Sequence, residues 1–280
     1  MFGPLHFQSK NNCDLSAQHL HACAKVQTVK PERNRNKPAR RLLPGLTVAD
    51  GYTRHPFDIE NRVRTSGLIA GRHLKSGHHH DRHATAYFGV APSVFHALIQ
   101  KWQKSHPIAG MQEFSFIDIG AGMGRAVLLA SQMPFRNVVG VELHPNLARI
   151  ARRNLAIWRA IGQARATSWI VCRDAVEFRF PAGPCLVFLF NPFGAPVMRR
   201  LMRALVGSFV ERPRQLDLLY VNNEQERVVE KHSGFTRLFL GQIRRSKADA
   251  IADHAIMANQ PDGEYASGNY EDCSIWRWFG

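Results

Sequence analysis

The sequence predicts an α/β fold, in which a mostly parallel sheet carries helices on both faces. Three observations lead to this prediction. Short apolar runs typical of buried strands alternate with segments of helical periodicity from residue 114 onward. The first run is followed by a glycine cluster. Each of the first four runs has a polar residue at or next to its end. Because parallel strands end at one edge of a sheet, we expect these polar residues to form one site.

The first strand and the turn after it predict a ligand cradle. The apolar run at 114–119 contains Asp118 and is followed by Gly120, Gly122 and Gly124. Glycine allows the backbone to approach a ligand closely, and the helix that follows offers unpaired N–H groups at its start. A strand, a glycine turn and a helix in this order are typical of a cofactor site.

The glycine spacing disfavours a dinucleotide cofactor. In the dinucleotide fingerprint G-x-G-x-x-G the third glycine (or alanine) packs helix against strand. Arg125 occupies that position here, and Gly124 falls one residue early. The spacing therefore argues against a nicotinamide-dependent dehydrogenase.

Three further strands end in side chains suited to a nucleoside. A carboxylate at the tip of the second strand, 22 residues after Gly120, can accept hydrogen bonds from both ribose hydroxyls. These strands are 138–141 before Glu142, 168–173 before Asp174, and 186–190 before Asn191, Pro192 and Phe193.

The remaining elements complete an alternating pattern. Apolar side chains at helical spacing predict helices, and short apolar runs predict the later strands. The predicted helices are 94–102, 145–160, 197–206 and 224–231, and the later strands are 216–221, 235–243 and 274–279. The segment 244–272 is polar, and we expect a turn at 261–264 within it.

The pattern Asp118-x-Gly120-x-Gly122-x-Gly124, together with the four strand tips, resembles class I S-adenosylmethionine (SAM) methyltransferases. The resemblance implies a Rossmann-like seven-stranded sheet, mostly parallel with an antiparallel last strand, and SAM as the cofactor. In that family the carboxylate and the loop face the methionine half of SAM, and the third acid or its neighbour meets the adenine. The implied cofactor-binding residues are Asp118, Gly120, Gly122, Gly124, Arg125, Glu142, Leu143, Asp174, Ala175 and Asn191.

The stretch Tyr87-Phe88-Gly89 before the first motif is similar to the loop of the disruptor-of-telomeric-silencing class of histone lysine methyltransferases. Related small protein-lysine methyltransferases share this likeness, which covers residues 85–210. Asn191-Pro192-Phe193 takes the place of that class's Asn-Asn-Phe. The resemblance implies N-methylation of a protein lysine, with Asn191 and Tyr87 as catalytic residues. Phe88, Pro192 and Phe193 would line the acceptor channel.

Two other functions stay open. Asn-Pro-Phe also resembles the Asn-Pro-Pro-aromatic motif of enzymes that methylate amino groups of nucleobases or glutamine, with one proline missing. The formal net charge of +15 permits attraction to RNA or DNA, but also to other anions. The third possibility is a catalytically silent SAM-binding module that acts through its basic arm.

We expect three regions: a basic, disordered N-terminal tail at 1–50, a loop and helix capping the SAM pocket at 51–110, and the methyltransferase domain at 111–280. Residues 25–41 hold seven Lys or Arg against one Glu, with little apolar periodicity. This tail is either an arm that holds a polyanion, such as nucleic acid, or a solvated extension.

Composition limits the setting. No apolar run approaches the ~18 residues of a membrane span, and the first residues lack the charged start and long apolar stretch of a secretory signal. The five cysteines form no C-x-x-C pair, which predicts a reducing, cytoplasmic location without disulfides. The histidines at 73–83 are expected to form an exposed loop rather than a metal site, because consecutive side chains point in different directions.

Overall fold

In this computed structural model, residues 53–259 and 265–280 are described fully, together with the backbone of two short strands, β1 (Ala39–Leu43) and β2 (Leu46–Ala49). These two strands pair antiparallel, whereas the sequence predicted a disordered tail over 1–50. The signal was a Pro-Gly pair between two leucine-containing runs, which marks a turn. The rest of the predicted tail, residues 1–38, lies outside the described residues.

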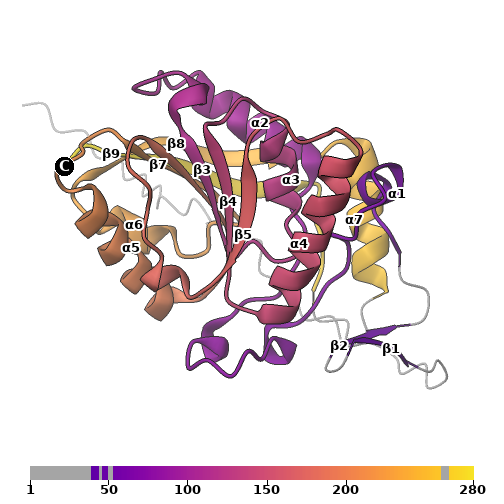
Figure 1. Cartoon of the computed structure of the whole chain (residues 1–280). Coiled ribbons are helices and arrows are strands. Elements are labelled where there is room, and N and C mark those ends of the chain that lie inside the picture. The colour runs from indigo at the N-terminus through magenta and orange to yellow at the C-terminus, as the bar shows by residue number, and fades with distance from the viewer. Residues whose placement is uncertain (1–38, 44–45, 50–52, 260–264) are drawn as a thin grey trace, which may run out of the picture.

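The core of the molecule is a seven-stranded sheet with the order β5-β4-β3-β6-β7-β9-β8 (Figure 1). The first five of these strands are parallel, and β9 lies antiparallel between β7 and β8. This confirms the predicted class I methyltransferase fold. The strands are β3 (Ser115–Ile119), β4 (Asn137–Glu142), β5 (Ser168–Cys172), β6 (Cys185–Phe190), β7 (Leu216–Val221), β8 (Phe235–Arg244) and β9 (Tyr270–Trp278).

Helices cover both faces of the sheet (Figure 1). One face packs against α2 (Pro92–Gln103), α3 (Arg125–Ser131) and α4 (Pro145–Ala160), in a core rich in aromatic side chains. The other face packs against α5 (Ala195–Phe209) and α6 (Glu226–Glu230). Four of these helices match the sequence prediction to within a few residues, and α3 is the helix that opens after the glycine turn. Among the described residues, no helix is both long and apolar enough to cross a bilayer.

The sequence missed helix α7 (Lys247–Ala258), which lies in the segment expected to be polar and irregular. Ser246 caps its N-terminus by accepting a hydrogen bond from the Asp249 backbone N–H at 3.1 Å. Ser246 and Asp249 have the spacing of a helix-capping pair, which is the signal that was overlooked. The Asp249 carboxylate then accepts a bond from the Ser93 N–H at 2.8 Å, so α7 is joined to the start of α2.

Residues 54–91, which we call the cap, cross the carboxyl ends of the parallel strands. The cap contains α1 (Pro56–Glu60) and two short 3-10 helices, η1 (Gly71–His73) and η2 (Asp81–His83). Figure 1 shows α1 at the right, next to α7, and the purple segment that follows α1 below the sheet, at the end where α4 begins. A bridge between Ala84 and Phe193 joins the cap to the loop after β6. The cap and the strand tips therefore enclose one site.

Candidate active site

A pocket lies between the cap and the carboxyl ends of β3, β4 and β6. Most of the residues singled out from the sequence line this pocket, so the fold brings together residues that are far apart in the sequence. They are Tyr87, Phe88, Asp118, Gly120, Gly122, Arg125, Glu142, Leu143, Asp174, Ala175, Pro192 and Phe193. Gly124 and Asn191 are the two predicted residues that are not part of the lining.

The glycine loop needs its glycines for two reasons. Gly120 and Gly122 have φ angles of 75° and 55°, a conformation that L side chains rarely adopt. A Cβ at Gly120 would lie 2.5 Å from the Cβ of Pro192, and one at Gly122 would lie 2.2 Å from the Tyr87 ring. Tyr87 and Pro192 therefore pack directly on the loop, where the resemblance places the methionine half of SAM.

Glu142 holds the glycine loop in place. One of its carboxylate oxygens accepts the Gly122 N–H at 2.7 Å, and the other accepts the His144 N–H at 2.7 Å. Burial raises the pKa of Glu142, and these backbone bonds oppose that rise. Each carboxylate oxygen keeps a lone pair with which it can accept a ribose hydroxyl.

The carboxyl group of Asp118 is unusual among the titratable groups of the pocket. Its residue is 3 % exposed, and within the described part of the chain no donor hydrogen-bonds its carboxylate. Burial, together with the nearby Glu142 carboxylate, raises the pKa of Asp118 to about 8. A buried carboxyl without a partner is costly, and a cation in the pocket would relieve that cost.

Asp174 connects the third strand tip to the cap. Its carboxylate accepts the Val176 N–H at 3.0 Å and lies 2.8 Å from His80 Nδ1. Arg200 Nη1 lies 2.8 Å from the other ring nitrogen of His80. Because a guanidinium only donates, that nitrogen accepts, and the His80 proton sits on Nδ1, facing Asp174. Burial lowers the pKa of His80, with the Arg200 charge adding to this and Asp174 opposing it.

The histidine run is more compact than the sequence predicted. One ring nitrogen from each of His78, His79 and His80 lies within 4.8 Å of the others. The reason is a tight turn, in which the Asp81 N–H donates to the His78 carbonyl at 3.0 Å. Both ring nitrogens of His80, however, already contact Asp174 and Arg200. The positive charge of the Arg200 guanidinium disfavours a metal ion at this position.

Asn191 occupies a strained position at the end of β6. Its φ is 38°, and its side-chain oxygen is buried without a hydrogen-bond partner. Its backbone carbonyl accepts a hydrogen bond from the Thr85 hydroxyl in the cap. Asn191 thus joins the cap to β6 through its main chain, while Pro192 and Phe193 supply the pocket wall. Asn191 itself is not among the residues that line the pocket.

Tyr87, the other residue predicted to be catalytic, lines the pocket with its ring against the glycine loop. Its hydroxyl donates to the Thr65 carbonyl at 2.7 Å. The hydroxyl is therefore held inside the cap, and the ring is what faces the site.

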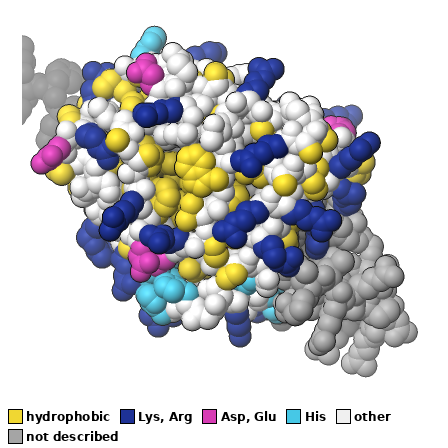
Figure 2. Space-filling model, viewed as in Figure 1, with side chains coloured by type: hydrophobic (Ala, Val, Ile, Leu, Met, Phe, Trp, Pro, Cys, Tyr) yellow, Lys and Arg dark blue, Asp and Glu magenta, His cyan; other side chains and the backbone are white. Residues whose placement is uncertain are grey.

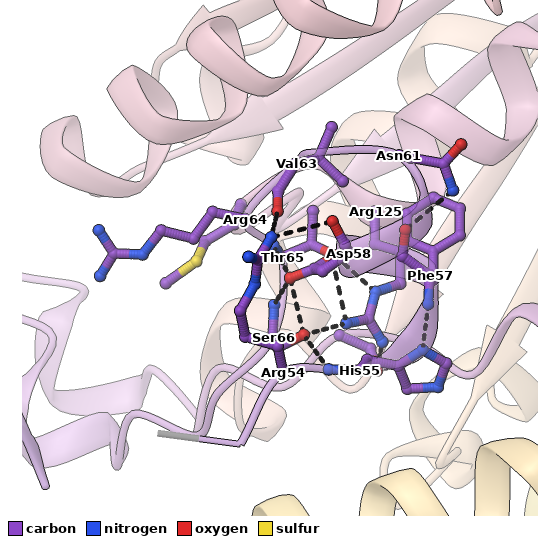
Figure 3. A network of polar contacts seen from close by, with 12 residues as sticks. Arg54, His55, Phe57, Asp58, Asn61, Val63, Arg64, Thr65, Ser66 and Arg125 are labelled. Atoms are coloured by element: carbon purple, nitrogen blue, oxygen red, sulfur yellow. Dashed lines mark hydrogen bonds and ion pairs between the residues drawn. The ribbon is translucent and has the colours of Figure 1, made fainter. Parts of the chain in front are cut away.

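Arg125, which the resemblance assigned to the cofactor, lines the pocket, but its guanidinium bonds to the cap (Figure 3). It is 2 % exposed and donates to the hydroxyl of Thr65 at 2.7 Å and to the carbonyl of Gly89 at 3.1 Å. Asp58 completes the network by accepting bonds from the backbone N–H groups of Thr65 and Ser66 at 2.6 and 2.7 Å. An arginine in the third-glycine position therefore joins the first helix of the fold to the cap.

Sequence reasoning did not single out several residues that build the site. Asp58, Thr65, Ser66 and Thr85 all lie in the region 51–110, which was expected only to form a loop and helix over the pocket. Thr65 and Ser66 accept bonds from Arg125 across 60 and 59 positions, and Thr85 bonds to Asn191 across 106. Local patterns carry no signal for such pairs.

Comparison with protein-family models and with curated proteins gave no match. Comparison with solved structures gave distant likenesses. A provisionally assigned RNA methyltransferase from Pyrococcus horikoshii is 15 % identical, with 66 % of this chain and 84 % of that chain covered and a TM-score of 0.43. Precorrin-6y C5,15-methyltransferase from Geobacter metallireducens is 16 % identical, with 66 % and 86 % covered and a TM-score of 0.44. The [4+2]-cyclase SpnF is 14 % identical, with 66 % and 81 % covered and a TM-score of 0.45. Likeness at this level does not determine a reaction, so function has to be argued from the site.

The pocket's own chemistry fits SAM. SAM presents an ammonium and a sulfonium together with a ribose, and the pocket offers the unpartnered Asp118 carboxylate beside Glu142. The glycine loop between them has no room for side chains, which leaves its backbone close to the pocket.

Proposed function

We propose that this protein is a SAM-dependent N-methyltransferase. The observation that carries the proposal is the pair of buried carboxylates, Asp118 and Glu142, at neighbouring strand tips on either side of a glycine loop. Asp118 would pair with the cationic methionine half, and Glu142 would accept the ribose hydroxyls. Asp174 and Ala175 would lie beside the adenine, as the resemblance implies.

SAM, when bound, supplies an electrophilic methyl on a sulfonium. The acceptor nitrogen's lone pair would take that methyl as the C–S bond breaks, and the nitrogen's proton would leave to solvent as the product is released. The contribution of this chain is to orient the two partners and to exclude water. Tyr87 and Pro192 pack the glycine loop, and Phe88 and Phe193 add apolar surface to the pocket. An amine acceptor has to be neutral to react, and an apolar wall favours the neutral form.

The protein-lysine acceptor implied by the resemblance stays a prediction. Asn191 is not among the residues that line the pocket, so the role predicted for its amide gains no support from the lining. An arginine-rich surface beside the pocket, described below, favours a nucleic-acid acceptor instead.

Two measurements test the proposal. Calorimetry with SAM should show binding to the wild type and at least ten-fold weaker binding to Asp118→Asn, a change that keeps the shape but removes the charge. Transfer of labelled methyl from SAM into a fractionated lysate should leave label in one fraction. Label that resists nuclease but not protease indicates a protein acceptor, and the opposite pattern indicates a nucleic acid. Absence of SAM binding would overturn the proposal, and binding without any transfer would point to the catalytically silent module.

A further inference from the structure

The outer side of helix α4 and strand β5 together form what we call the α4–β5 face. Residues 143–173 contain six arginines and no Lys, Asp or Glu. All six arginines are exposed: Arg149, Arg152, Arg153, Arg159, Arg165 and Arg173. Figure 2 looks onto this side of the molecule and shows Lys and Arg side chains distributed around a central hydrophobic patch. The face is therefore basic, with apolar surface at its centre.

Two of these arginines are positioned along the open edge of the sheet. Among the described strands β5 is the last of the sheet, so no described strand pairs with its outer edge. Arg152 donates to the carbonyl of Ile170 at 3.3 Å, and Arg159 donates to the carbonyl of Ser168. These carbonyls stand on either side of Trp169. The contacts hold two guanidinium groups beside the strand without neutralising their charge.

Trp169 is the exposed aromatic residue of this face. It is 41 % exposed, whereas the other four tryptophans of the chain are at most 5 % exposed. Alternation along β5 explains this. Ser168 and Ile170 face the side of the sheet that α4 covers, and Trp169 points to the other side, where Val171 packs against the second core. On this end strand the Trp169 indole is only partly covered, and it offers a flat surface on which a base can stack.

The face continues into the pocket. Arg173 directly follows β5, is exposed, and also lines the pocket. It lies four residues beyond Trp169, about 13 Å at the rise of a strand. That distance matches a few nucleotides of an extended single strand.

We propose that the α4–β5 face binds single-stranded nucleic acid and leads it to the pocket. Phosphates would pair with the arginines, because the planar guanidinium matches phosphate geometry, and an unpaired base would stack on Trp169. This inference names the substrate class of the proposed methyltransferase and rests on that function for the transfer step. The binding step stands by itself and is tested without SAM.

Tryptophan fluorescence tests the stacking directly. Titration of the full-length protein with a twelve-nucleotide single-stranded RNA should quench the solvent-exposed part of the emission, and Trp169→Phe should abolish that quenching. By anisotropy of the labelled RNA, Trp169→Phe should bind nearly as tightly as the wild type, because it can still stack. Trp169→Leu should bind about ten-fold more weakly.

The charge contribution is tested with a matched pair of variants. Arg149→Gln/Arg153→Gln removes two exposed charges from α4, and Arg244→Gln/Lys247→Gln removes two exposed charges where β8 meets α7, at the other end of the sheet from β5. The α4 variant should reduce the slope of log affinity against log salt by about 1.4. The β8–α7 variant should leave that slope unchanged.

Several results would overturn the proposal: unchanged RNA affinity in Trp169→Leu, equal losses in the α4 and β8–α7 variants, or binding of poly-glutamate equal to that of RNA. A DNA strand of the same sequence and an RNA duplex serve as further ligands. Preference for the duplex would also count against it, because a paired base cannot stack on Trp169. Each variant is tested for SAM binding in parallel, so failure of the cofactor site is distinguishable from failure of the RNA site.

Discussion

The Nε of Arg125 lies 2.7 Å from the Thr65 hydroxyl, so the first residue of helix α3 is bonded directly to the cap. The two groups are 60 positions apart in the sequence and both are buried. The glycine loop ends at Arg125, and the cap carries Tyr87, which packs on that loop. Arg125 therefore couples the position of the cap to the position of the cofactor loop.

Replacing Arg125 should destabilise the cap. Arg125→Ala leaves buried acceptors in Thr65, Ser66 and Gly89 without their donor, which should cost about 3 kcal/mol in the free energy of unfolding. Urea unfolding measures the cost, and hydrogen exchange should show faster exchange over residues 54–66. Arg153→Ala, an exposed change on α4, is the control and should alter stability by less than about 0.5 kcal/mol. Equal stability of the two variants would remove Arg125 from this role.

Adding one methyl group to the glycine loop should abolish cofactor binding. In Gly122→Ala the new Cβ would overlap the Tyr87 ring at 2.2 Å, and the φ of 55° is strained for alanine. We expect SAM affinity to fall by at least ten-fold. Gly207→Ala is the same chemical change in helix α5, where a Cβ meets nothing within 4 Å, and it should raise stability by about 0.5 to 1 kcal/mol. Calorimetry and thermal unfolding of both variants make the comparison.

SAM binding should depend on pH through Asp118. In the free protein the pKa of this carboxyl is raised to about 8, so the group is mostly protonated at pH 7. A bound cation favours the ionised form, so binding releases a proton. The dissociation constant should therefore fall about ten-fold per pH unit between pH 6 and 8 and then level off.

Calorimetry in two buffers of different ionisation enthalpy measures the released proton. Asp118→Asn cannot ionise and should show a weaker dissociation constant without this slope. A wild-type constant that stays flat from pH 6 to 8 would contradict the assignment of Asp118 as the partner of the cation.

The His80 contact predicts weakening of the cap at low pH. Burial lowers the pKa of His80 below its ordinary 6.5, so its neutral form contributes stability that is fully present above pH 6.5 and is lost as the pH falls through the folded pKa. His78, His79, Asp174 and Arg200 face the ring, and Arg200 opposes its protonation. Proteolysis within the cap should therefore accelerate at pH 5 relative to pH 7.

Histidine variants test this contact. His80→Phe removes both ring nitrogens and should make cleavage in the cap fast at either pH. His79→Ala, an exposed neighbour, should retain the wild-type pH dependence. A His80→Phe protein that behaves like the wild type would show that the contact to Asp174 does not hold the cap.

The sequence determined the fold class, the glycine loop and the set of strand tips. Those signals are local, because burial of a strand, the start of a helix and the need for glycine each depend on neighbouring residues. The same locality explains the misses. Helix α7 was not predicted, because its capping pair, Ser246 and Asp249, lies in a segment of polar composition. The β1–β2 pair was not predicted, because it lies in a basic segment.

Tertiary structure alone decided which distant groups meet. It bonded Arg125 to the cap and joined the Asn191 carbonyl to the Thr85 hydroxyl. It also set Trp169 among arginines at the open edge of β5. Hydrophobic periodicity records whether a side chain is buried but not what it touches, since burial is rewarded whichever apolar surface covers it. Polar partners 35 to 106 positions apart are chosen only when the packed elements bring them within hydrogen-bond distance.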